Sequence, residues 1–380
     1  MTTGLNRRQA LALTAGGLAV CAAPGLLAQE GPSLHELART KGMRFGTAVG
    51  MGRPGTLTGA FSDPAYRAIV QRECGILVHE NALKWYVLRP DEETYFFTPA
   101  DTLVDFATEN GLAVRGHTLL WNREEFSPAW VNNYDFGSRP ASEAERLVRE
   151  HIATVVAHYR GRITSWDVIN ETIDPRTGRL RETSLTRHLG ENIVDIAFDA
   201  TREADPGGEL VYNDYMSWEA GHEMHQEGVL RLLEGMRERG VPIDALGVQS
   251  HIGSGNFDES TGFDTARDEH WRGFLDGVTG LDLDLLITEF DVHDKNLPYD
   301  IESRDTAVAD LARRYLDLMF SYPQTKDVLC WGLCDRYSWL QNLWPRSDGE
   351  AKRPTPFDAD YRPKPLYDAI AAAFQAAAPR

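Results

Sequence analysis

From Met43 onward, short apolar stretches alternate with longer segments whose apolar residues recur every three or four positions. The short stretches predict buried strands, and the longer segments predict amphipathic helices. Eight strands are expected, at 45–49, 76–79, 113–117, 165–169, 210–213, 246–250, 285–289 and 328–333. The clearest helices are expected at 142–159, 189–204, 219–239, 304–320 and 364–378.

Capping residues mark several of the expected helix ends. Ser142 precedes Glu145 by three residues, which is the order of a capping box at a helix start. Gly111, Gly161 and Gly240 come just after expected helices, where a left-handed residue is favoured. Eight strand-helix units in succession predict an α/β fold, a single-domain (β/α)8 TIM barrel. A doubly wound sheet is the alternative fold.

Two of the expected strands end in a glutamate. Asn170 and Glu171 follow the strand at 165–169, and Glu289 ends the strand at 285–289. In a barrel of this kind, the carboxyl ends of the strands form the face that carries out catalysis. Glycoside hydrolysis needs two such carboxyls, because one protonates the leaving oxygen and the other stabilises or attacks the sugar carbon.

Polar and aromatic residues also stand at the ends of other expected strands. Amides and carboxylates hydrogen-bond to sugar hydroxyls, and indole faces pack on sugar rings, so this pattern predicts a sugar-binding cleft. The residues are Glu80, Asn81 and Lys84 after the second strand, His117 and Trp121 after the third, Tyr215 after the fifth, Gln249 and His251 at the sixth, and Trp331 and Trp339 at the eighth.

Composition narrows the class of partner. With 42% hydrophobic and 25% charged residues, the chain has the composition of an ordinary globular protein. Its formal net charge of −18 argues against nucleic acid or an anionic membrane surface as the main partner. A neutral polysaccharide is compatible with this charge.

The first 28 residues are expected to be a signal peptide. Arg7 and Arg8 precede an uncharged stretch, 10–27, and Ala28 is a plausible cleavage site. The paired arginines indicate twin-arginine export, with an ordinary secretory signal as the alternative. The mature domain, 29–380, would then be periplasmic or secreted and free of the membrane. Loss of two arginines takes its net charge to −18 − 2 = −20.

Three cysteines follow the signal, Cys74, Cys330 and Cys334. The last two either form a disulfide in an oxidising compartment or remain buried thiols. His222 and His225 have a spacing seen in metal ligands, but no further ligand accompanies them. This pair is therefore predicted to lie on a solvated helix face, and no metal or organic cofactor is expected.

Two segments in combination resemble glycoside hydrolase family 10, the endo-1,4-β-xylanases. They are Trp-Asp-Val-Ile-Asn-Glu at 166–171 and Thr-Glu-Phe-Asp at 288–291. The likeness extends across the mature chain and implies a retaining enzyme acting on xylan and xylo-oligosaccharides without a cofactor. It also implies that Glu171 is the general acid/base and that Glu289 is the nucleophile. Separately, a monomer is expected.

The same resemblance implies roles for the other candidate residues. Asn170 would hold the 2-hydroxyl of the sugar at the cleavage point. The next sugar towards the non-reducing end would be bound by Glu80, Asn81 and Lys84. The site would be lined by His117, Trp121 and Gln249 and covered by Trp331 and Trp339. Behind Glu289 would lie His251 and Asp291, and Tyr215 would lie on the leaving-group side.

Two of the departures from the family pattern concern the leaving-group side. Asn122 stands where the family usually has histidine, and Met216 stands where asparagine is frequent. Both could alter binding of the leaving group, and the loop 123–130 is unusually acidic. Two other functions stay open, another retaining barrel β-glycosidase such as an endo-glucanase, and a non-catalytic sugar-binding barrel. A reducing-sugar assay on several polysaccharides separates the three.

Overall fold

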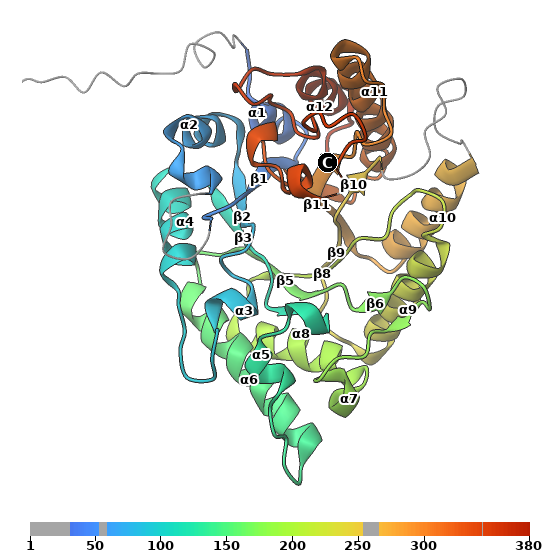
Figure 1. Cartoon of the computed structure of the whole chain (residues 1–380). Coiled ribbons are helices and arrows are strands. Elements are labelled where there is room, and N and C mark those ends of the chain that lie inside the picture. The colour runs from blue at the N-terminus through green and yellow to red at the C-terminus, as the bar shows by residue number, and fades with distance from the viewer. Residues whose placement is uncertain (1–30, 53–58, 254–265, 344) are drawn as a thin grey trace, which may run out of the picture.

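The computed structural model describes residues 31–52, 59–253, 266–343 and 345–380. The expected signal peptide, 1–28, lies outside the described residues. Within them, eight parallel strands form a closed barrel, and the longer helices surround it (Figure 1). The predicted (β/α)8 barrel is therefore confirmed.

The barrel strands neighbour one another in chain order, and the last closes onto the first. Phe45 lies opposite Val328 in this closing parallel pair. Each strand overlaps a stretch that the hydrophobic pattern predicts. The strands are β1 (Arg44–Val49), β2 (Ile76–His79), β3 (Ala113–Gly116), β5 (Ser165–Asn170), β8 (Glu209–Asp214), β9 (Ala245–Val248), β11 (Asp284–Val292) and β12 (Thr325–Cys330).

Short strands extend the chain beyond the barrel strand ends. One pairs with the end of β5 and carries Trp121, and another pairs with the end of β11 and carries His251. These pairings fix two candidate site residues in place. The short strands are β4 (Leu120–Trp121), β6 (Ile173–Asp174), β7 (Arg179–Leu180) and β10 (His251–Ile252).

The longer helices lie outside the barrel (Figure 1). They are α2 (Pro64–Glu73), α4 (Thr98–Glu109), α6 (Pro140–Tyr159), α8 (Asn192–Ala204), α9 (Glu223–Arg239), α10 (Ala266–Gly280), α11 (Ile301–Phe320) and α12 (Pro365–Ala376). The short helices are α1 (Leu34–Arg39), α3 (Trp85–Leu88), α5 (Ala129–Asn132) and α7 (Thr186–Leu189).

The helix start predicted at Ser142 is wrong. Helix α6 begins two residues earlier, at Pro140, and the residue before it, Arg139, makes no side-chain capping bond. Proline is favoured at the first helical position, because its fixed φ suits the helix and it lacks an N–H that would be left unpaired. This preference outweighs the capping-box order of Ser142 and Glu145.

Glycine ends the helices as predicted at three positions. Gly111, Gly161 and Gly240 have φ values of 68°, 77° and 76°, in the left-handed region. A fourth glycine shortens the helix that was expected at 189–204. Gly190, with φ 57° and ψ −143°, ends α7, so α8 starts only at Asn192.

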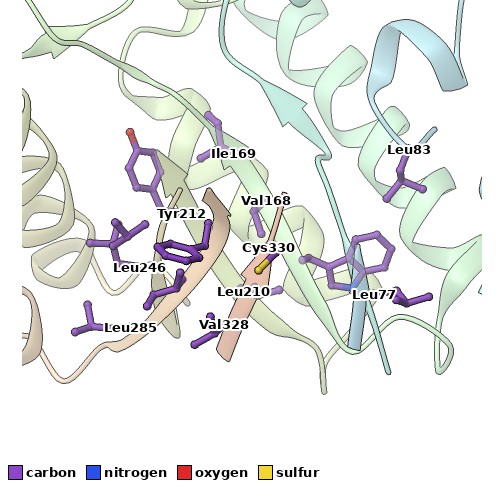
Figure 2. Packing of buried hydrophobic residues seen from close by; sticks show 14 of the residues in the cluster. Leu77, Leu83, Val168, Ile169, Leu210, Tyr212, Leu246, Leu285, Val328 and Cys330 are labelled. Carbon is purple, nitrogen blue, oxygen red and sulfur yellow. The ribbon is translucent and has the colours of Figure 1, made fainter. Parts of the chain in front are cut away.

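Residues alternate along the barrel strands between two surroundings, as the strand period of two requires. On β2, Leu77 belongs to the large core that strands and helices share, whereas Ile76 and Val78 join a small cluster with Leu329 and Trp331. Figure 2 shows part of the large core, to which four successive strands contribute Leu210, Leu246, Leu285 and Val328.

The barrel also contains charged side chains, which are paired. Arg44 binds Asp327 through two hydrogen bonds of 2.6 and 2.7 Å. Arg115 is fully buried, donates to Ser165 Oγ at 2.7 Å and forms an ion pair with Asp167. A buried charge is tolerated only when it is paired in this way.

We predict that Gly46→Ala lowers the free energy of unfolding by about 3 kcal/mol or more. A Cβ at this position in β1 would lie 2.0 Å from the Ile76 carbonyl oxygen in the neighbouring strand. Gly273→Ala is the matched control in helix α10, because nothing lies within 4 Å of its added Cβ. It should stabilise the protein by ~0.5–1 kcal/mol. Urea unfolding measures both, and similar values would contradict the argument from close approach.

Candidate active site

One cleft collects most of the candidate residues. It has a volume of about 630 Å³ and lies at the carboxyl ends of the barrel strands. The candidates in its lining are Lys84, His117, Trp121, Asn170, Glu171, Tyr215, Gln249, His251, Glu289, Trp331 and Trp339. Residues that sequence reasoning did not place there also line it, namely Arg123, Phe126, Ser217, His222, His293 and Leu343.

Three other candidates lie next to this cleft rather than in its lining. Asp291 is buried behind it, on β11. Glu80 and Asn81 lie beside Lys84, and Asn81 Nδ2 donates to Glu80 Oε1 at 3.2 Å. Burial raises the pKa of Glu80, and the neighbouring Lys84 ammonium opposes this effect.

Glu289 is a buried and ionised carboxylate on β11. Asn213 Nδ2 donates to its Oε1 at 2.9 Å, and His251 Nε2 lies 3.3 Å from its Oε2. Burial by itself would raise the pKa of Glu289. The hydrogen bond from His251, together with nearby His117 and Lys84, outweighs burial and lowers this pKa to about 2. Glu289 is thus held in its ionised form over the ordinary pH range.

His251 and Asp291 form the network behind Glu289. His251 Nδ1 lies 2.8 Å from Asp291 Oδ1, and Trp339 Nε1 donates to Asp291 Oδ2 at 2.8 Å. Burial disfavours a charged imidazole, but the Asp291 carboxylate prevails and raises the pKa of His251 to about 10. One charged network therefore links β10, β11 and the segment that follows β12.

Glu171 has a conformation that residues other than glycine rarely adopt. Its φ is 56°, in the left-handed region, and its N–H donates to Asn213 O at 2.9 Å. Strained backbone of this kind is concentrated at functional sites. Gln249 Nε2 donates to Glu171 Oε1 at 3.0 Å, and the Asn170 amide lies 3.3 Å from the same oxygen.

A cation also contacts Glu171, and no motif in the sequence indicated it. Arg123 Nη1 donates to Glu171 Oε2 at 3.0 Å. The two residues are 48 positions apart and belong to different loops. Local patterns in a single sequence do not reveal such a contact, because it depends on how two loops fold over the barrel.

Lys84 and two indoles occupy the side of the cleft near β2. Lys84 Nζ donates to Asn81 Oδ1 at 2.9 Å and lies 4.5 Å from the Trp121 ring centre and 5.8 Å from that of Trp331. Burial lowers the pKa of Lys84, and the Glu289 carboxylate opposes this effect. A buried ammonium among ring faces can bind sugar hydroxyls while the rings pack on the sugar.

His117 is held by Asp167, which is also the ion-pair partner of Arg115 in the barrel. Its Nδ1 lies 2.8 Å from Asp167 Oδ2 and 4.0 Å from Glu289 Oε1. The His117 ring packs edge-on against Trp331, with ring centres 5.3 Å apart. The buried ion pair between Arg115 and Asp167 thus fixes an imidazole beside Glu289.

The opposite side of the cleft carries Tyr215. Arg181 Nη2 donates to the Tyr215 hydroxyl at 2.6 Å, and Arg181 Nε donates to Glu171 O at 2.9 Å. His222 lines the cleft, and His225 is fully buried 3.1 Å from Asp214. The prediction that these two histidines form a solvated face is therefore wrong, because His225 on α9 packs against Asp214 and His222, just before α9, lines the cleft.

The two departures on the leaving-group side are buried behind the cleft. Asn122 accepts a hydrogen bond from Thr183 Oγ1 at 3.3 Å, and Met216 is 1% exposed. Neither side chain lines the cleft, so any effect on binding must pass through neighbouring groups. Cys74, Cys330 and Cys334 are buried free thiols, without the disulfide that the sequence left open.

The part of the chain that the structure describes holds no group of three or more His, Cys, Asp or Glu residues suited to a metal ion. In the same residues, no helix is both long enough and apolar enough to cross a membrane.

Comparison with known proteins gives one consistent family. A family model for "Glycosyl hydrolase family 10" matches residues 33–373. Endo-1,4-beta-xylanase B of Thermotoga neapolitana is 32% identical over 311 residues, covering 80% of this chain and 82% of the relative. Endo-1,4-beta-xylanase 3 of Hypocrea jecorina is 32% identical over 348 residues, covering 91% and 87%. The solved structure of xylanase 10B from Thermotoga petrophila RKU-1 in complex with xylobiose matches with a TM-score of 0.78 and 30% identity, covering 91% and 98%.

We predict that the stabilising effect of His251 depends on pH. Its pKa in the folded protein, about 10, lies above the ordinary value of 6.5, so its contribution is complete below pH 6.5 and is lost as pH rises towards 10. The difference in unfolding free energy between wild type and His251→Gln should therefore shrink over this range. Urea unfolding at several pH values measures it. His270→Gln, at an exposed position, is the control and should change stability little at any pH. A constant difference for His251→Gln would contradict the ion pair.

Proposed function

The chain belongs to glycosyl hydrolase family 10, and we propose that its cleft cleaves β-1,4-xylosidic bonds with Glu289 as nucleophile and Glu171 as general acid/base. Its activity is that of a retaining endo-1,4-β-xylanase, the hydrolysis of xylan. One observation supports the choice of nucleophile. Glu289 is held ionised by His251, and Glu171 faces the same cleft from another strand end.

In the first step, Glu289 attacks the anomeric carbon as the bond to the leaving oxygen breaks. Glu171 gives its proton to that oxygen, so the departing sugar leaves as a neutral alcohol. The Glu289 carboxylate becomes an ester. The Asn213 amide, which donates to Glu289 Oε1 at 2.9 Å, keeps that oxygen aligned.

In the second step, water attacks the anomeric carbon of the glycosyl-enzyme. Glu171, now a carboxylate, takes a proton from the water, and the bond to Glu289 breaks. Two displacements on the same carbon return the β-configuration. His251 and Asp291 then stabilise the carboxylate that Glu289 regains.

We propose that xylo-oligosaccharides lie along the whole cleft. The related xylanase 10B from Thermotoga petrophila RKU-1 was solved with xylobiose, which supports binding of short xylose chains in this family. The sugar on the non-reducing side would be bound by Lys84, Asn81 and Glu80, beside the Trp121 ring. Tyr215 and Arg181 would contact the leaving-group side.

We predict that the first product from an aryl β-xylobioside is the β-anomer, and that Glu289→Ala abolishes hydrolysis of every glycoside tested. NMR recorded before mutarotation identifies the anomer.

The kcat/KM for an aryl β-xylobioside should exceed that for the matching β-cellobioside by about tenfold or more, because the site rejects one misplaced hydroxymethyl group. An α-anomer would exclude the double displacement, and a preference for the cellobioside would favour the endo-glucanase alternative.

We also propose that the chain is exported through its paired arginines. The support is the order of Arg7 and Arg8 before the uncharged stretch 10–27. Replacing both arginines by lysine should leave the protein in the cytoplasm with its signal uncleaved, as cell fractionation and mass spectrometry would report. Unchanged export of that variant would indicate the general secretory route.

A further inference from the structure

Arg123 bridges two carboxylates at the edge of the cleft. Its Nη1 donates to Glu171 Oε2 at 3.0 Å, and its Nε donates to Glu125 Oε1 at 2.9 Å. The Arg123 side chain is 28% exposed, the Glu171 side chain 7%, and the Glu125 side chain 55%. One guanidinium is thus shared between a buried carboxyl group of the active site and an exposed one on the loop.

Arg123 is the cation that contacts the Glu171 carboxyl oxygens in the described part of the chain. Arg181 is close by, but its Nε donates to the Glu171 backbone oxygen and its Nη2 to the Tyr215 hydroxyl. Lys84 adds positive charge to the cleft, and its Nζ donates to Asn81. The contact of Arg123 with Oε2 is therefore distinct from the general charge of the cleft.

This contact conflicts with the first step of the reaction. As an acid, Glu171 must carry its proton on one oxygen and direct it towards the leaving oxygen. Oε1 faces the Gln249 amide N–H at 3.0 Å, so a proton on Oε1 would meet another donor. The proton therefore belongs on Oε2, which is the oxygen that Arg123 occupies.

We propose that Arg123 competes with the catalytic proton for Glu171 Oε2, and that Glu125 draws Arg123 away when the acid is needed. Arg123 is then a positioning residue that sets what fraction of the enzyme is ready for the first step. The inference rests on the proposed function, because it needs Glu171 to be the acid. After the leaving group has taken the proton, Arg123 can return to Oε2 and stabilise the carboxylate.

Two substrates separate this role from a structural one. Phenyl β-xylobioside has a poor leaving group, so its kcat/KM depends on the proton from Glu171, whereas 2,4-dinitrophenyl β-xylobioside needs no proton for departure. The ratio of the two kcat/KM values, phenyl over dinitrophenyl, therefore measures acid assistance. A change in packing or in substrate access would alter both values together and leave the ratio unchanged.

At neutral pH, Arg123→Met should raise this ratio by about two- to fivefold, the range expected for removing an ion pair of about 0.4–1 kcal/mol. Arg123→Lys, which keeps the charge, should restore a ratio near that of wild type. Glu125→Gln should lower the ratio, because Arg123 loses its alternative partner. Arg187→Met is the matched control, since Arg187 pairs with Glu124 and Glu182 on neighbouring loops and lies outside the cleft lining. Its ratio should equal that of wild type.

Opposite shifts in Arg123→Met and Glu125→Gln would support the competition. An unchanged ratio in both variants, with both substrates still hydrolysed, would overturn the role of Arg123 while leaving the xylanase function in place. A folded wild-type enzyme that hydrolyses neither xylobioside would overturn the proposed function, and the role of Arg123 with it.

Discussion

The buried negative charge of Glu289 is the constraint on which the active site depends. Moving a carboxylate out of water is unfavourable unless hydrogen-bond donors and positive charge compensate it. Asn213 and His251 contact its two oxygens at 2.9 and 3.3 Å, and Lys84 adds positive charge. These groups come from β8, from β10 and from the segment after β2. The closed barrel brings them together, so the fold and the charge state of Glu289 are coupled.

The barrel and its two glutamates could be predicted because both depend on patterns within short segments. An apolar stretch that ends in a carboxylate can be recognised in the sequence. Parallel strands in a barrel then bring their carboxyl ends to one face. For this reason Glu171 and Glu289 were placed correctly on one cleft without any long-range information. The family resemblance then supplied the pairing of His251 with Asp291, which the structure shows at 2.8 Å.

Contacts between distant segments could not be predicted in this way. His225 looked like a solvated residue because its neighbours on α9 are polar, yet it is buried against Asp214 on β8. Arg123 looked like one charge in an acidic loop, yet it reaches Glu171. In both cases a charged partner on another element decides the environment, and the local pattern of hydrophobic and polar residues carries no information about that partner.

The two glutamates differ in how freely their surroundings can change. His251, which contacts Glu289, is itself bound by Asp291, and Asp291 is bound by Trp339, so this network has little freedom. Arg123, which contacts Glu171, has a second and exposed partner in the loop. In the proposed mechanism, Glu289 as nucleophile needs one fixed protonation state before attack, whereas Glu171 as acid/base must lose and regain a proton in every turnover. A rigid buried network meets the first need, and an exchangeable ion pair at the cleft edge meets the second.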